Sequence, residues 1–160
     1  MLDEANARPL VSALLRGIEV EPRPDLIGAI IDRSEGHPFV IQHIADKLRT
    51  LKSPRIPDVE QVLEQLLVPP SVLDLGHHAT RLAKYYGDRE DVALKILDEL
   101  SKSLEGLHVD ELARKLSTTR ADLVPAIRDL RDDDYITIAN SHARFTLDFV
   151  RRYWREDRMV

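Results

Sequence analysis

Six side chains in the second half of the chain have the chemistry needed to contact a nucleic acid. Arginines pair with phosphates or base edges, and threonine hydroxyls bind the sugar–phosphate backbone. The candidates are Thr118, Thr119, Arg120, Arg128, Arg131 and Arg144. Five aspartates share this stretch, and three of them form a run at residues 132–134. Residues 89–160 hold 13 Lys and Arg against 15 Asp and Glu, a net charge of −2, whereas a DNA-binding face is usually basic. The charges therefore favour docking to a protein, with duplex DNA as the alternative.

The second candidate is the tripeptide Gly36-His37-Pro38. Glycine suits the left-handed residue that ends one helix, and proline suits the first turn of the next. Proline also presents a flat apolar face, and a helix N-terminus favours the negative charge of a phosphate. Two interpretations stay open at this point: a plain corner between two helices, or a corner that faces a ligand.

Metal and catalytic chemistry have weaker support. His77 and His78 are adjacent, and neighbours on a helix point about 100° apart, so they seldom chelate one ion. No carboxylate cluster accompanies them, and we expect no metal site. The absence of cysteine excludes disulfides, thiolate nucleophiles and cysteine-bound zinc. No nucleophile, base and acid share a catalytic spacing, so we expect no catalytic residues.

The composition is that of an ordinary globular chain. The 160 residues suffice for one or two small domains, and 23 Lys and Arg against 28 Asp and Glu give a net charge of −5. No apolar run approaches the roughly 20 residues needed to cross a bilayer, and no signal-peptide core opens the chain. We therefore expect a soluble, cytoplasmic protein with no membrane partner.

The first half of the chain is expected to be helical throughout. Apolar residues recur at helical spacing in five segments before the seam that we place at Tyr85-Tyr86-Gly87-Asp88. The first predicted helix covers residues 2–18, with Pro9 producing a kink or a later start. The second is capped by Asp25 and ends at residues 34–36, and the third has Pro38 in its first turn. The fourth is capped by Asp58 and ends at Pro69-Pro70, and the fifth covers residues 72–86.

The second half combines helices with short β-prone runs. Helices are predicted over residues 89–104, 110–116 and 121–131, followed by a hairpin over 135–138 and 143–147 and an amphipathic last helix. In that last helix Tyr153 and Trp154 are expected to anchor the core, leaving arginines 151, 152, 155 and 158 as a solvated face. This order predicts a winged helix-turn-helix in a mainly α protein. The residues expected to be buried are Ile31, Phe39, Ile44, Leu97, Leu112, Leu116, Leu123, Ile127, Ile136, Phe145 and Trp154.

The segment Ile30–Gln42, IIDRSEGHPFVIQ, resembles the "sGGhPfxlQ" signature of the helical lid in the STAND branch of AAA+ ATPases, the signal-transduction ATPases with numerous domains. Further likeness to archaeal and bacterial members, which include relatives of replication initiators, spans nearly the whole chain. It lies in Leu2-Asp3-Glu4-Ala5, Leu14-Leu15, Asp74-Leu75-Gly76-His77-His78, Arg81-Leu82, Tyr85-Tyr86-Gly87, Phe145-Thr146-Leu147 and Arg152-Tyr153-Trp154.

The resemblance implies a helical lid over residues 1–70, a connector helix over 71–88 and a winged-helix domain over 89–160. It also implies that Gly36, His37 and Pro38 sense the nucleotide, with Pro38 packing on the adenine ring. A histidine stands where replication-initiator relatives often have a sensor arginine nearby, and a neutral imidazole is a weaker phosphate partner. No GxxxxGK[ST] motif occurs in the chain, so ATP or ADP would be held only together with a P-loop domain, and the chain brings no metal of its own.

The expected function is therefore a non-catalytic part of an ATPase that works in signal transduction. The lid senses the nucleotide held by the nucleotide-binding domain of the same parent protein, and the winged helix relays that state by docking to an effector protein or domain. The alternative is a DNA-binding winged helix of a regulator or of an initiator-like ATPase.

Overall fold

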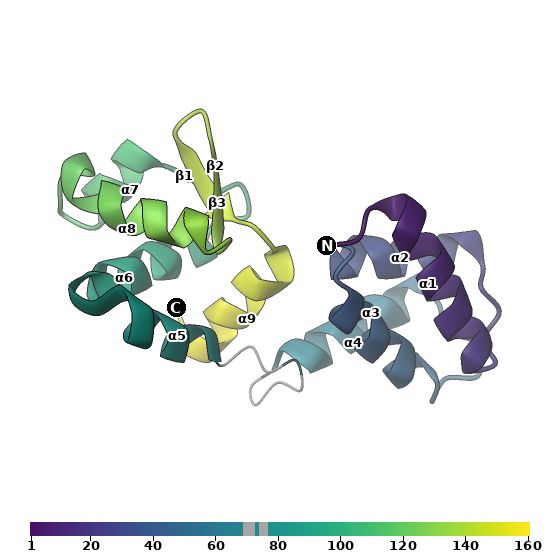
Figure 1. Ribbon diagram of the computed structural model, residues 1–160. Helices are drawn as coiled ribbons and strands as arrows, with labels where there is room; N and C mark the ends of the chain where they lie inside the picture. The colour runs from purple at the N-terminus through teal and green to yellow at the C-terminus, as the bar shows by residue number, and fades with distance from the viewer. Residues whose placement is uncertain (69–72, 74–76) are drawn as a thin grey trace. The chain divides into compact units, whose positions relative to one another are not determined.

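The computed structural model describes residues 1–68, 73 and 77–160, with the backbone alone for residues 77–79 and 83. The chain forms two compact units, Met1–Leu73 and Asp74–Val160 (Figure 1). The protein is mainly helical, as predicted, and its small antiparallel sheet has three strands, the expected hairpin and one strand more. Residues 71, 72 and 74–76 of the expected connector, and the expected Pro69-Pro70 helix end, lie outside the described residues.

The described part of the first unit contains four helices: α1 (Glu4–Gly17), α2 (Pro24–Ser34), α3 (Pro38–Leu48) and α4 (Ile56–Leu67). Helix α2 packs on α1 and α4, and α3 packs on the same two helices (Figure 1). Each helix turns one apolar face inward, and helical periodicity alone is enough to place most of this core. The largest fully buried side chains here are Leu15, Leu26, Ile30, Ile41, Ile44, Leu48, Leu63 and Leu66.

Helix starts in this unit depart in detail from the sequence prediction. Asp25 does not cap α2: the helix begins at Pro24, whose fixed φ suits the first helical position, and Asp25 lies in the first turn. Asp58 is not the N-cap of α4 either. It is the third helical residue, and its carboxylate accepts the backbone N–H of Arg55, the true N-cap, at 2.6 Å. Helix α1 starts at Glu4 and continues through Pro9.

The second unit begins with α5 (His77–Tyr86), a 3₁₀ turn η1 (Gly87–Arg89) and α6 (Glu90–Ser101). Strand β1 (Leu107–His108) leads into α7 (Val109–Lys115) and α8 (Arg120–Asp132). The hairpin β2 (Ile136–Ala139) and β3 (His142–Phe145) and the last helix α9 (Asp148–Arg158) complete the unit. The order of helices and hairpin predicted for this half is therefore present (Figure 1).

The sheet has the order β1-β3-β2. Ile136 pairs with Phe145, and His142 pairs with both Ala139 and His108. The two residues that join β2 to β3, Asn140 and Ser141, both have positive φ, 50° and 62°. Two successive left-handed residues match the right-handed twist of a two-residue hairpin, and asparagine tolerates this conformation well.

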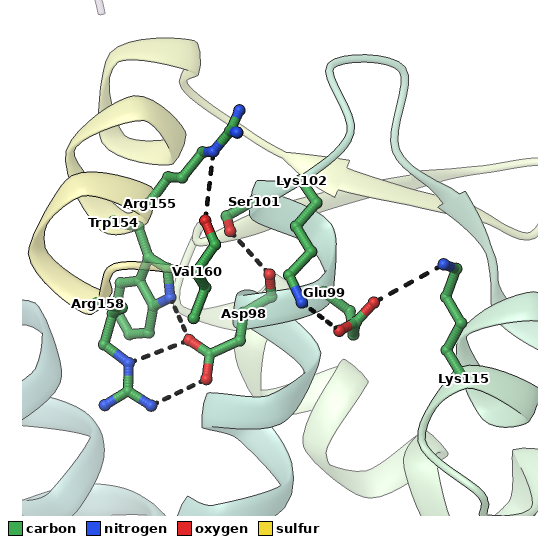
Figure 2. Close-up of polar contacts among 9 residues, drawn as sticks. All are labelled: Asp98, Glu99, Ser101, Lys102, Lys115, Trp154, Arg155, Arg158 and Val160. Carbon is green, nitrogen blue, oxygen red and sulfur yellow. Dashed lines mark hydrogen bonds and ion pairs between the residues drawn. The ribbon is translucent and has the colours of Figure 1, made fainter.

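Helix α9 is held onto α6 by a carboxylate that three N–H groups share (Figure 2). The Trp154 indole donates to Asp98 at 2.9 Å, and the Arg158 guanidinium donates to the same carboxylate at 3.1 and 2.9 Å. Tyr153 and Trp154 are buried, as predicted. The expectation that all four arginines of this helix form a solvated face is wrong. Arg151 is only 13% exposed and binds Asp148 and the Ser101 carbonyl, because the helix lies flat on α6.

Most of the expected core is confirmed, with one clear error. Ile44, Leu97, Leu112, Leu123, Ile127, Ile136, Phe145 and Trp154 are buried. Ile31 and Leu116 are half-buried. Phe39 is 44% exposed, because Val40, Ile41 and Ile44 occupy the inward face of α3 and turn the neighbouring position outward. Its ring stands edge-on against His43, with centroids 4.5 Å apart.

Candidate functional site

Two places carry the candidate residues: helix α8 with the hairpin in the second unit, and the corner formed by residues 36–38 in the first. At the start of α8 the hydroxyls of Thr118 and Thr119 are already engaged. Thr119 caps the helix by accepting the Asp122 N–H, and both hydroxyls donate to the Asp122 carboxylate, at 3.3 and 2.6 Å. These hydrogen bonds lower the pKa of Asp122. A phosphate would have to displace a charged acceptor to reach either hydroxyl.

Two of the candidate arginines on α8 are paired with carboxylates. Arg120 Nη1 lies 3.3 Å from Asp110 Oδ1 on α7. The Arg131 guanidinium donates two hydrogen bonds to Asp132, at 3.0 and 2.8 Å. All four side chains are more than half exposed, so these pairs add little stability. Each pair instead reduces the net positive charge of α8, because a carboxylate lies beside the arginine.

Arg128 and Arg144 differ from these two. Both are exposed, and within the part of the chain that the structure describes neither forms an ion pair with a carboxylate. Arg128 lies on the outward face of α8 with Ala121, Val124 and Pro125, all exposed and spaced as one helical stripe. Val124 is 39% exposed. The outward face of α8, defined by these four residues, is therefore apolar with a single cation.

Arg144 lies on the hairpin, beside a hollow of about 420 Å³. Its other lining residues are Glu105, Thr137, Ala139 and His142. The last three alternate outward along β2 and β3, and the ring of His142 stands edge-on to that of His108, 5.2 Å between centroids. Among the described residues, this hollow is therefore lined by one positive charge, that of Arg144, and one negative charge, that of Glu105.

Sequence reasoning missed a second hollow, of about 400 Å³, between α5, η1 and the C-terminal end of α8. The buried Tyr86 hydroxyl donates to Asp133 at 2.9 Å, and Arg89 pairs with Asp129 at 3.0 Å. Burial first, and the Asp133 hydrogen bond second, raise the pKa of Tyr86. In the sequence, Tyr85-Tyr86 was the available signal for this hollow, but the pair was interpreted only as the boundary between the two halves of the chain. The remaining lining residues are Arg81, Tyr85 and Asp132.

In the first unit, the corner of residues 36–38 joins α2 to α3. Glu35 and Gly36 are both left-handed, with φ of 51° and 69°, and Pro38 is the first residue of α3. Pro38 is exposed. No side chain caps α3, so the positive end of the α3 dipole lies uncapped at this corner. Partial burial, and then the positive charge of the chain's amino terminus, lower the pKa of His37. The lowered pKa favours the neutral imidazole, which is a weaker partner for phosphate charge than an arginine would be.

The structure thus brings Thr118, Thr119 and Arg120 together at one end of α8, with Arg128 and Arg131 further along the helix and Arg144 on β3. Gly36, His37 and Pro38 are contiguous in the other unit. The side chains of His77 and His78 lie outside the described residues. Among the residues that are described, no group of three or more His, Asp or Glu is placed to hold a metal ion.

The chain matches no protein-family model, no curated protein and no solved structure. In the described ranges no helix combines the length and apolar character that crossing a membrane requires.

Proposed function

We propose that this chain is the lid and docking part of a STAND-type AAA+ ATPase. The first unit closes over a nucleotide held by a P-loop domain of the same parent protein, with residues 36–38 facing that nucleotide. The second unit is a winged helix-turn-helix that relays the nucleotide state by docking to a protein. The part described here brings no catalytic residue, and ATP or ADP binds only together with the P-loop domain.

The role of the first unit is supported by the corner at residues 36–38. An exposed proline opens an uncapped helix, beside a left-handed glycine, in a four-helix unit whose sequence resembles the STAND lid. Pro38 offers a flat apolar surface to a base, and the helix dipole favours phosphate charge. Because its lowered pKa favours the neutral imidazole, His37 is a weak partner for phosphate charge, and we propose that the corner senses occupancy and leaves the stimulation of hydrolysis to other groups.

The winged-helix assignment of the second unit is supported by the order α6, β1, α7, α8, β2, β3 and by the pairing of β1 with β3. The observation that carries the docking role is the pairing on α8. Two of its arginines are paired with Asp110 and Asp132, and both threonine hydroxyls bind Asp122. The outward face shows Ala121, Val124 and Pro125, with Arg128 as its single cation. An apolar stripe edged by internally neutralised charges suits a protein surface.

Docking of this chain onto the P-loop domain tests the proposal. The coding sequence upstream of the Met1 codon should contain a GxxxxGK[ST] motif, and the domain that carries it is added as a separate polypeptide. Calorimetry with ADP and with a non-hydrolysable ATP analogue should give dissociation constants that differ by about tenfold, a coupling of roughly 1.4 kcal/mol.

Pro38→Ala should shrink that difference, whereas Pro57→Ala should leave it unchanged. Pro57 is the matched control, because it is also an exposed proline in the first turn of a helix of the same unit. Equal affinity in both nucleotide states, or no docking at all, would contradict the lid assignment.

Duplex DNA is the second candidate partner. The observation that favours it is the exposure of Arg128 and Arg144 without carboxylate partners in the described part of the chain. DNA binding through these groups would weaken steeply with salt and would be lost in Arg128→Ala.

A further inference from the structure

The residues that lead into α1 are in direct backbone contact with the corner of residues 36–38. The Leu2 N–H donates to the Gly36 carbonyl at 2.9 Å. In return, the Leu2 carbonyl group lies over the Gly36 Cα. A Cβ added there would overlap the Leu2 oxygen and would lie 3.4 Å from the Leu2 carbonyl carbon. Only glycine leaves room for this contact, and its φ of 69° independently favours glycine.

The corner itself is fixed by the helix that it ends. The Gly36 N–H donates to the Ile31 carbonyl at 3.2 Å, and the His37 N–H donates to the Ser34 carbonyl at 2.9 Å. These bonds satisfy carbonyls at the end of α2, as in other glycine-ended helices. One residue later Pro38 begins α3. The Gly36 carbonyl therefore projects from a rigid turn.

The leading segment, residues 1–3, is fixed at its other end as well. Asp3 caps α1, and its carboxylate accepts the Asn6 N–H at 2.9 Å. Three residues thus connect the N-terminus of α1 to the turn between α2 and α3.

We infer that Gly36 latches the leading segment through Leu2, so that a ligand engaging residues 36–38 also holds or releases the chain that leads into α1. Gly36 is a positioning residue, because it contacts residues 1–3 and holds them beside the corner of residues 36–38. The inference rests on the proposed function for its ligand, a nucleotide held by the P-loop domain. The latch itself is a property of this chain alone.

Amide exchange at Leu2 tests the latch. The chain is prepared with a short Ser-Gly extension, so that the Leu2 amide does not follow a charged terminus. In the wild type this amide should exchange at least about tenfold more slowly than an unprotected amide. Gly36→Ala should abolish that protection. Gly28→Ala is the matched control, because a Cβ at Gly28 meets nothing within 4 Å, and protection should persist.

A second variant guards against loss of folding in Gly36→Ala. Leu2→Pro removes the donor without altering the turn, and it should shift the amide resonances of Gly36 and His37 while those of α4 stay in place. An unprotected Leu2 amide in the wild type, protection that survives Gly36→Ala, or an unshifted turn in Leu2→Pro would overturn the latch.

The same amide is then followed in the complex with the P-loop domain. Leu2 protection should differ between the ADP and ATP-analogue states. If docking depends on the nucleotide but Leu2 protection does not, the inference fails while the proposed function stands. If nucleotide-dependent docking is absent, the proposed function and the relay both fail, and the latch is judged from the isolated chain.

Discussion

Arg120 on α8 faces Asp110 on α7, with Arg120 Nη1 3.3 Å from Asp110 Oδ1. The contact joins the first residue of one helix to the first turn of another, and both side chains are about half exposed. The Asp110 carboxylate therefore lies beside Arg120, the arginine that follows Thr118 and Thr119 directly in the sequence. Together with the Arg131–Asp132 pair, it explains how a helix with three arginines can lack a basic face.

Removing the two carboxylates should uncover the masked cations. We predict that Asp110→Asn with Asp132→Asn gives the chain a measurable, salt-sensitive affinity for duplex DNA at low salt, where the wild type shows none, because two more guanidinium groups can reach phosphates. Fluorescence anisotropy of a labelled duplex measures the change. The matched control is Glu4→Gln with Asp46→Asn, which makes the same change in net charge and frees Arg8 and Arg49 in the first unit. An equal gain in the control would show that net charge alone acts.

Asp98 should be the most sensitive carboxylate of the second unit. Asp98→Ala leaves the buried indole N–H of Trp154 and the Arg158 guanidinium without their shared acceptor, and should lower the free energy of unfolding by about 2 kcal/mol. Trp154 is the sole tryptophan, so its fluorescence during urea unfolding reports on this unit.

Asp91→Ala on the same helix is the control for Asp98→Ala. Asp91 is 76% exposed and bonds only to Lys95 among described residues, so its loss should lower the free energy of unfolding by less than about 0.5 kcal/mol. Unfolding midpoints that fall equally in the two variants would contradict the role given to Asp98.

Phe39 should contribute little to the stability of the first unit. Because its side chain is 44% exposed, Phe39→Ala should lower the free energy of unfolding by less than about 1 kcal/mol. Ile44→Ala, in the fully buried face of the same helix, should lower it by about 3 kcal/mol. Exchange of the most protected amides in α1 and α3 measures both changes. A larger effect from Phe39→Ala would mean that its ring is buried in solution.

His37 should titrate below the ordinary histidine value of about 6.5. Partial burial and the nearby amino terminus both disfavour the imidazolium in the folded chain. The contribution of His37 to stability is therefore fully present above pH 6.5, and it declines as the pH falls toward the lowered pKa. The ring resonances of His37 across a pH series give the pKa directly. A value at or above 6.5 would contradict the argument that the folded chain disfavours the imidazolium.

Helical periodicity predicted the elements well because each helix and strand buries one face. The buried positions of α6, α8 and the hairpin followed from spacing alone. The failures have local causes. The N-caps expected at Asp25 and Asp58 lie two and three residues earlier, at Arg23 and Arg55, because a proline occupies one of the first two positions of each helix. Phe39 was predicted to point inward together with Ile41 and Ile44, although the 100° step of the helix places only the latter two on the buried face.

The candidate sites were predictable as residue types but not as contacts. The sequence showed more carboxylates than arginines around α8, yet whether Asp110 of α7 meets Arg120 depends on the angle between α7 and α8. The Leu2–Gly36 contact joins residues 34 positions apart through backbone atoms, for which side-chain patterns carry no signal. The hollow beside Tyr86 depends in the same way on how α5 and α8 pack.

The most direct test of the docking role is the anisotropy of a labelled DNA duplex titrated with the wild-type chain across a salt series. We predict no saturable binding at 50 mM salt, because the arginines of α8 are largely neutralised within the protein. Tight binding that weakens steeply with salt, and that Arg128→Ala abolishes, would contradict the protein-docking role and establish α8 as a DNA-recognition helix.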